Sequence, residues 1–136
     1  MIAVDASALL TVLRQEEDAQ LYSDFLRQRP GELVISAPGF VEATIAAERR
    51  LEGAGGAVLM ANYCKALGVE IAPFSESHMS CALEGFARFG QGRGKEPSAL
   101  NFGDCLSYGF AMAEGIPLLF AGKDFTKTDV KVQKLK

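Results

Sequence analysis

Four acidic side chains of this 136-residue sequence stand beside apolar segments, and together they could hold a metal ion. They are Asp5 after the run IAV, Glu42 in PGFVEATI, Asp104 in LNFGDCLSYGFA and Asp124 in GKDF. Carboxylates gathered in a partly dry pocket repel one another unless they are protonated or a cation neutralises them. Oxygen ligands without a usable His or Cys favour magnesium or manganese over zinc or copper. Hydrolysis of a phosphodiester bond is the natural chemistry of such an ion, which binds phosphate and activates water.

Asp5 and Asp104 each have a structural reading as well. Asp5 could cap a helix that begins near Ala6, because an Asp at that position accepts hydrogen bonds from free amide groups, and Ser7 could do the same. Asn101 stands three residues before Asp104, close to a capping box, and an acid in the first turn suits the helix dipole. Ser7 could instead hydrogen-bond a carboxylate or a water on the metal. These alternatives stay open at the level of the sequence.

Glu42 and Asp124 also have ordinary explanations, one in a helix dipole and the other in a turn. Caps and turns, however, require neither apolar surroundings nor a shared crevice. Glu42 is flanked by apolar residues on both sides, and the segment after Asp104 is apolar nearly all round, which predicts a buried helix. The joint pattern therefore favours a metal site.

The elements that must position these acids follow from hydrophobic periodicity. Apolar runs predict strands at 2–5, 32–36, 69–74 and 116–121, and the tail VKVQKLK alternates like a final edge strand. Helical spacing predicts helices at 6–17, 18–28, 38–52, 57–67, 75–89 and 101–114. Strands separated by helices imply a mostly parallel sheet covered on both faces, a three-layer α/β/α sandwich formed by one domain, 1–136. Ligands bind at the carboxyl ends of such strands, where the four acids are expected.

Composition narrows the class of protein. The chain is 49% hydrophobic and 23% charged, as expected for one compact domain, and its apolar runs are too short to span a membrane. A soluble, cytoplasmic protein is expected. Cys64, Cys81 and Cys105 lack CxxC spacing and are interpreted as small buried hydrophobes in a reducing compartment. His78 has no second His to form a ligand pair, which argues against zinc hydrolases, and a helix-surface position is expected for it.

Basic residues concentrate in two places although the net charge is −3. The segment 123–136 holds five lysines against two aspartates, a net of +3, and the loop 90–98 carries cations among glycines. The first segment could simply be a solvated tail, and the second an ordinary linker. The candidates for phosphate contacts are Arg93, Lys95, Lys123 and Lys127.

The sequence resembles the PIN-domain ribonucleases, and specifically the VapC-type toxins of bacterial toxin-antitoxin pairs. The resemblance rests on VDASALL, PGFVEATI, LNFGDCLSYGFA and LLFAGKDFTKTDV, which together run from the first predicted strand to the last. VDAS alone is a weak signal, whereas LNFGDCLSY followed by GKDFTKTD at this length is quite specific.

This resemblance implies a PIN-like fold and a magnesium- or manganese-dependent endoribonuclease. Acids matching Asp5, Glu42 and Asp104 bind the metal in that family, and Asp124 would be a supporting ligand, although some relatives carry an acid or Asn where this chain has Lys123. Glu42 or Asp104 would orient or deprotonate the attacking water. The resemblance also implies tRNA or another structured RNA as substrate, a homodimer, and a small VapB-like antitoxin as inhibitor.

Other readings use similar acids. A haloacid-dehalogenase-like phosphatase requires a second Asp where this chain has Ser7, and a receiver domain requires an Asp after its third strand, where IAPF offers none. The remaining alternative is a non-catalytic PIN-like module that binds RNA or a partner. The retained acids argue against that module.

Overall fold

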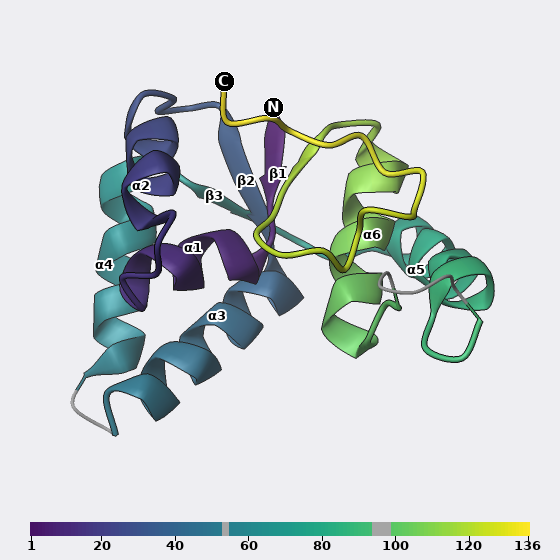
Figure 1. Cartoon of the computed structure of the whole chain (residues 1–136), viewed down its shortest axis with the longest axis horizontal. Helices are drawn as coiled ribbons and strands as arrows, with labels where there is room; N and C mark the ends of the chain where they lie inside the picture. The colour runs from purple at the N-terminus through teal and green to yellow at the C-terminus, as the bar shows by residue number, and fades with distance from the viewer. Residues whose placement is uncertain (53–54, 94–98) are drawn as a thin grey trace.

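The computed structural model describes residues 1–52, 55–93 and 99–136. Its centre is a four-stranded sheet with the strand order β3-β2-β1-β4 (Figure 1). The strands are β1 (Ile2–Val4), β2 (Leu33–Ser36), β3 (Glu70–Ala72) and β4 (Leu118–Leu119). Every neighbouring pair is parallel, so all four carboxyl ends lie at one edge of the sheet.

Helices cover both faces of this sheet (Figure 1). One layer consists of α1 (Ala6–Leu13), α2 (Ala19–Arg27), α3 (Ala37–Arg50) and α4 (Gly56–Leu67). The opposite layer consists of α5 (Glu76–Phe89) and α6 (Phe102–Glu114). The predicted three-layer α/β/α architecture with a parallel sheet is therefore confirmed.

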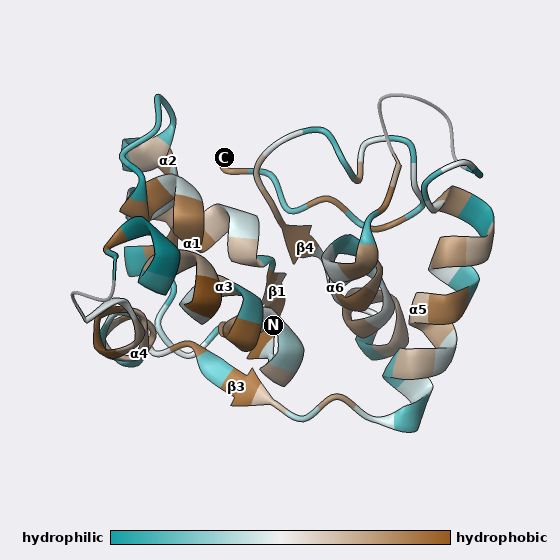
Figure 2. Ribbon diagram, turned by 90° about the horizontal axis from the view of Figure 1, so that it is seen from below, coloured by the Kyte–Doolittle hydropathy of each residue, from teal (hydrophilic) through white to brown (hydrophobic). Residues whose placement is uncertain are grey.

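Alternation along the strands explains the two layers. In β1, Ile2 and Val4 enter the core beneath α1 to α4, whereas Ala3 enters the core beneath α6. In β2, Leu33 likewise enters the core beneath α1 to α4, and Val34 enters the core beneath α6. Both strands are buried on both faces, as parallel strands between helices must be. Figure 2 shows β1 and β4 as hydrophobic segments, while β3 at the sheet edge is mixed.

Local signals set the helix ends near the site. Ser36, the last residue of β2, caps α3 by accepting a hydrogen bond from the Gly39 N–H (3.1 Å). Gly68 and Gly115 end α4 and α6 with left-handed backbone (φ +72° and +68°), a conformation that glycine adopts without steric cost.

Some predicted bounds were wrong. The first helix was expected to reach residue 17 but ends at Leu13, because the polar residues that follow offer nothing to bury and Gln15 adopts a positive φ of 52°. The last core strand is only β4, shorter than the expected 116–121. The tail pairs with β4 through a single parallel bridge, Leu118 to Val132. The expected edge strand is thus reduced to one contact.

His78 is the clearest correction. It is 5% exposed and lies between α5 and α6, where its ring is 4.8 Å from the ring of Phe110. The expected surface position was wrong because α6 covers the face of α5 that carries it. Cys64, Cys81 and Cys105 are free thiols, and the first and last of them are buried. Within the described residues, no helix combines the length and apolarity of a membrane span.

Candidate active site

Asp5 lies directly after β1 and is 4% exposed. One carboxylate oxygen accepts a hydrogen bond from the Ser7 N–H (3.0 Å), so Asp5 is the N-cap of α1. The other oxygen accepts a hydrogen bond from the Ser107 hydroxyl on α6. Asp5 therefore has the predicted capping role and also connects β1 to the opposite helix layer.

Asp104 occupies the first turn of α6 and is 8% exposed. Its Oδ2 accepts from the Asn101 N–H (3.1 Å), and its own N–H donates to Asn101 Oδ1 (2.8 Å). This reciprocal pair is the capping box that the spacing predicted. The helix that follows is buried over most of its surface, as its composition indicated.

The electrostatics show which acids lie near Asp104. Burial is the largest of the effects that raise its pKa to about 8, and the hydrogen bond from Asn101 opposes this shift. The negative charges of Asp124 and Asp5 raise the pKa further, as does a hydrogen bond that protonated Asp104 donates to Asp124. Asp5, Asp104 and Asp124 therefore form one cluster of carboxyl groups.

Glu42 reaches this cluster from α3. A Cβ atom added to Gly103 would lie 2.3 Å from Glu42 Oε2, so the carboxylate lies directly against the backbone of α6. Partial burial raises the pKa of Glu42, and the charge of Asp5 adds to this shift. The residue keeps substantial contact with solvent. Glu42 thus stands at the open side of the cluster, where only glycine at position 103 leaves room for it.

Two serines connect the acids to their surroundings. Ser7 Oγ accepts a hydrogen bond from the Ala121 N–H (3.0 Å), which ties the start of α1 to the segment after β4. Ser7 is therefore not the N-cap of α1, because Asp5 has that role. Ser107, which donates to Asp5, was missed by sequence reasoning. Ser107 could have been found as a polar residue within an apolar helix, one helical turn after Asp104.

Three of the four candidate phosphate-binding residues lie in loops that the structure describes. Arg93 belongs to the connection into α6, and its guanidinium lies 5.0 Å from the centroid of the Phe86 ring. Lys123 and Lys127 are exposed in the same segment as Asp124. Lys95 lies outside the described residues. The structure thus brings two of the four cations onto the loop that carries an acid of the cluster.

The donor set fits a hard divalent cation. The side chains that meet here offer carboxylate and hydroxyl oxygens, and a bound cation would favour the charged form of the buried Asp104. Among the described residues, no three His, Cys, Asp or Glu side chains are placed to enclose an ion together. Magnesium does not require such a cage, because it keeps several waters and binds through one or two carboxylates.

A groove of about 940 Å³ opens beside Glu42, between α1, α3 and the start of α6. Apolar side chains line most of it, including Val41, Ile45 and Phe102, which are 54%, 47% and 81% exposed. Three arginines complete the wall: Arg14, Arg49 and Arg50. The groove can receive a chain that is apolar on one face and acidic at its edges.

Known proteins share this sequence over nearly its whole length. The PIN domain family model matches residues 2–131. Ribonuclease VapC28 of Mycobacterium tuberculosis is 36% identical over 128 residues, which are 94% of each chain. Ribonuclease VapC of Mycolicibacterium smegmatis is 33% identical over 129 residues, 95% of this chain and 97% of the relative.

Solved structures share the fold. VapC20 of Mycobacterium tuberculosis, described as a toxin that cleaves the sarcin-ricin loop, superposes with a TM-score of 0.76 at 18% identity and covers 98% of this chain and 99% of that one. A toxin-antitoxin complex from Klebsiella pneumoniae gives a TM-score of 0.69 at 13% identity, with 98% and 97% covered. At these identities the likeness concerns the fold alone.

Proposed function

This chain belongs to the PIN-domain family, in the branch of the VapC ribonucleases, and from that premise we propose that residues 1–136 form one metal-dependent endoribonuclease domain, the toxin of a toxin-antitoxin pair. The observation that carries the proposal is the buried Asp104, whose pKa is raised to about 8 by burial and by Asp124 and Asp5. Asp5 and Asp104 each cap a helix, but capping does not require these acids to lie together with Asp124, whereas binding of a cation does.

Asp5, Glu42, Asp104 and Asp124 are the residues that would hold Mg²⁺ or Mn²⁺. When bound, the cation supplies positive charge for the scissile phosphate and lowers the pKa of a coordinated water. Asp5 is held by Ser7 and Ser107, so its carboxylate is fixed in orientation. Glu42, at the open side, is the group best placed to receive a proton from the attacking water, because its pKa is raised by partial burial and by Asp5.

The proposed substrate is tRNA or another structured RNA. Arg93, Lys95, Lys123 and Lys127 are proposed to contact phosphates, and cleavage should weaken as salt is added. Support comes from the description of VapC20 as a toxin that cleaves the sarcin-ricin loop. The alternative, a non-catalytic module that binds RNA or a partner, would keep the salt dependence and lack the cleavage.

A small VapB-like antitoxin is the proposed protein partner. The complex from Klebsiella pneumoniae and a DNA-bound VapBC from Salmonella typhimurium, both similar in fold, are toxin-antitoxin assemblies. The groove beside Glu42 supports this proposal, since its exposed apolar side chains suit an amphipathic segment and its arginines suit that segment's acids. Such a segment would lie across the entrance to the carboxylates.

A homodimer in the cytoplasm is the proposed setting. Phe102, at 81% exposure beside the acid cluster, and Met79, Leu83 and Phe86 on α5 leave apolar surface that a partner would cover. Light scattering of the purified chain measures the oligomeric state directly.

The test is cleavage of total tRNA and of a sarcin-ricin loop RNA by the purified protein, with Mg²⁺, Mn²⁺ or chelator. Asp104→Asn is run beside it, since the amide is nearly isosteric and can still accept the capping hydrogen bond. Discrete fragments that require metal and are absent from the variant are expected. Absence of cleavage by a folded wild type, with RNA binding retained, would favour the binding module.

A further inference from the structure

The segment that carries Asp124 contains neither helix nor strand. From Gly122 to Lys131 the chain runs through bends and turns, and Asp124 itself is exposed. It nevertheless lies close enough to Asp104 for its charge and a hydrogen bond to raise the pKa of that residue. Because the segment has no helix or strand of its own, its position against α6 depends on side-chain contacts.

One of these contacts lies one helical turn further along α6. Tyr108 follows Asp104 by four residues and therefore lies on the same side of the helix. Its hydroxyl donates to Asp129 Oδ1 at 2.6 Å, and Asp129 follows Asp124 by five residues. The same two segments are thus joined twice, once where Asp104 contacts Asp124 and once by the hydrogen bond from Tyr108 to Asp129.

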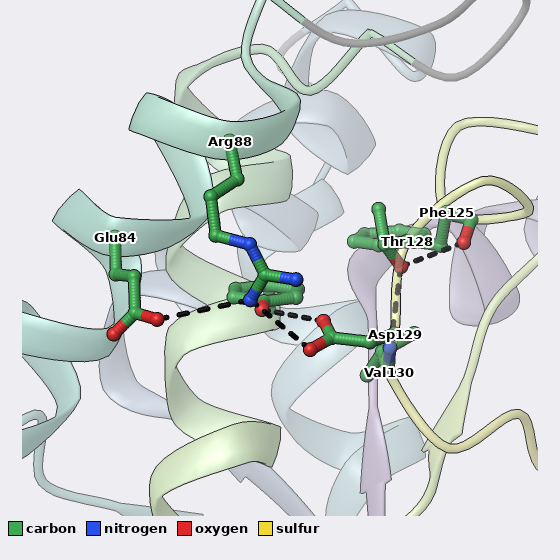
Figure 3. Close-up of polar contacts among 7 residues, drawn as sticks. Glu84, Arg88, Phe125, Thr128, Asp129 and Val130 are labelled. Atoms are coloured by element: carbon green, nitrogen blue, oxygen red, sulfur yellow. Dashed lines mark hydrogen bonds and ion pairs between the residues drawn. The ribbon is translucent and has the colours of Figure 1, made fainter.

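Arg88 completes the contact from α5. Its guanidinium donates to Asp129 Oδ2 at 3.1 Å and lies 3.7 Å from Glu84 Oε1, as Figure 3 shows. The guanidinium also lies over the ring of Phe89, 4.6 Å from its centroid. Asp129 therefore uses both carboxylate oxygens, each toward a different helix.

The partners differ in burial. Tyr108 is 2% exposed, and its ring packs edge-on against Phe89 at 5.8 Å, so its hydroxyl has a fixed position. The side chains of Arg88 and Asp129 are 47% and 42% exposed. Water and salt screen the ion pair, and the hydrogen bond from Tyr108 carries most of the attachment.

Other contacts also anchor the segment, and Phe125 and Val130 belong to the same core cluster as Tyr108. Phe125 is 2% exposed and packs on Phe120, with ring centroids 4.9 Å apart, which fixes the segment to the end of β4. Thr128 Oγ1 donates to the carbonyl of Phe125 (2.7 Å) and shapes a local turn (Figure 3). Removal of the Tyr108 hydroxyl therefore removes one tie and leaves these in place.

We propose that Tyr108, Asp129 and Arg88 are positioning residues, which hold the Asp124 segment beside Asp104 and so pre-arrange the fourth acid for the cation. This inference rests on the proposed metal-dependent function. A segment held in place loses less conformational freedom when the ion binds, and affinity for the ion rises accordingly.

The test uses Tyr108→Phe in the full chain, with Tyr63→Phe on α4 as the matched control in the other core. Calorimetry with Mn²⁺ should show affinity weakened roughly 3- to 10-fold in Tyr108→Phe and unchanged in Tyr63→Phe. Amide hydrogen exchange over 122–131 should be faster in the metal-free Tyr108→Phe protein and should return toward wild type with excess Mn²⁺. Asp129→Asn, at an exposed position that does not endanger the fold, should shift both readouts in the same direction.

The metal dependence of cleavage gives a second readout. Tyr108→Phe should require more Mn²⁺ for half-maximal activity and recover near wild-type kcat at saturating Mn²⁺. Wild-type protein that binds Mn²⁺, beside variants of unchanged affinity and unchanged exchange, would overturn the positioning role alone. Wild-type protein that binds no Mn²⁺ would overturn the proposed function, and the inference with it.

Discussion

The helices α5 and α6 begin with the same hydrogen-bonding arrangement and use it for different purposes. At the start of α5, His78 Nδ1 accepts a hydrogen bond from the Ser75 N–H at 2.8 Å. At the start of α6, Asp104 Oδ2 accepts one from the Asn101 N–H at 3.1 Å. Both third residues are buried, and both reach back to the N-cap in a capping box.

The two capping boxes differ in what contacts the side-chain atoms of His78 and Asp104 that do not take part in capping. His78 Nδ1 is an acceptor, so the ring proton is on Nε2, which donates to Glu114 Oε2 at 2.7 Å. The buried imidazole is thereby satisfied. Asp104 instead meets Asp124 and Asp5, and burial with these charges raises its pKa to about 8. The remaining ring nitrogen of His78 has a hydrogen-bond partner, which indicates a structural role. The buried carboxyl of Asp104 lies beside two other acids, which indicates a cation site.

The largest expected effect comes from exchanging an acid for its amide on each side of this comparison. Asp104→Asn should lower cleavage by about 100-fold or more at unchanged fold, because the charge that the cation requires is lost. Glu114→Gln, the matched change beside His78, should leave cleavage near wild type. Initial rates on tRNA and circular dichroism spectra check both. Equal losses of cleavage in the two variants would show that the two capping boxes do not differ in function.

His78→Ala tests the structural box. The change removes a buried ring packed against Phe74 and Phe110 together with its hydrogen bonds to Ser75 and Glu114. The free energy of unfolding should fall by about 2–4 kcal/mol, measured in urea. Added Mn²⁺ should still stabilise the variant, since the acids are untouched. A variant that had lost this response would make α5 part of the metal site.

Gly103→Ala sharpens the comparison at the metal side. A Cβ atom at this position would collide with the carboxylate of Glu42, which is the flexible end of a side chain and can move aside. Stability should therefore change little, while cleavage falls roughly 10-fold because Glu42 no longer reaches the cluster. Thermal melts and rates measure the two effects. Unchanged cleavage would show that the position of Glu42 is not critical.

The pH dependence of stability separates the boxes without RNA. The pKa of Asp104 is raised from 3.8 to about 8 on folding, so the stability that the protonated carboxyl contributes is complete below the lower value and lost as pH rises through the upper one. Metal-free wild type should therefore lose a few degrees of Tm between about pH 5 and pH 8 relative to Asp104→Asn. Mn²⁺ should offset the loss in wild type alone. The same dependence of Tm on pH in the two proteins would contradict this assignment.

The sequence predicted the layered fold because its periodicity depends on burial, which the two cores of the sheet confirm. It also predicted the capping box at Asp104 and the buried helix behind it, since three-residue spacing and all-round apolarity are local signals. It failed for His78, because periodicity along α5 does not show which face α6 covers. Ser107 and Asp129 were missed for a related reason. Their partners, Asp5 and Tyr108, lie far away in the sequence.

The bound of the first helix and the pairing of the tail failed for a different reason. Gln15 adopts a left-handed backbone conformation, which residue preferences do not favour, and so α1 ends before the predicted residue 17. Lys131 and Gln133 bond to Leu118 in a single bridge, although their alternation fits a longer strand. Pairing length depends on the partner, and β4 offers only two residues.

Ser7→Ala carries the smallest expected effect and tests whether a side chain inside the acid site can be purely structural. Ser7 Oγ accepts from the Ala121 N–H, and the same residue's N–H donates to Asp5. The backbone bond survives in the variant, so the orientation of Asp5 is kept, while loss of the hydroxyl should cost about 1 kcal/mol of unfolding free energy. Calorimetry should find Mn²⁺ affinity unchanged, which would place Ser7 with His78 on the structural side. Weakened affinity at unchanged stability would place it with Asp104, because the hydroxyl would then act on the ion or its water.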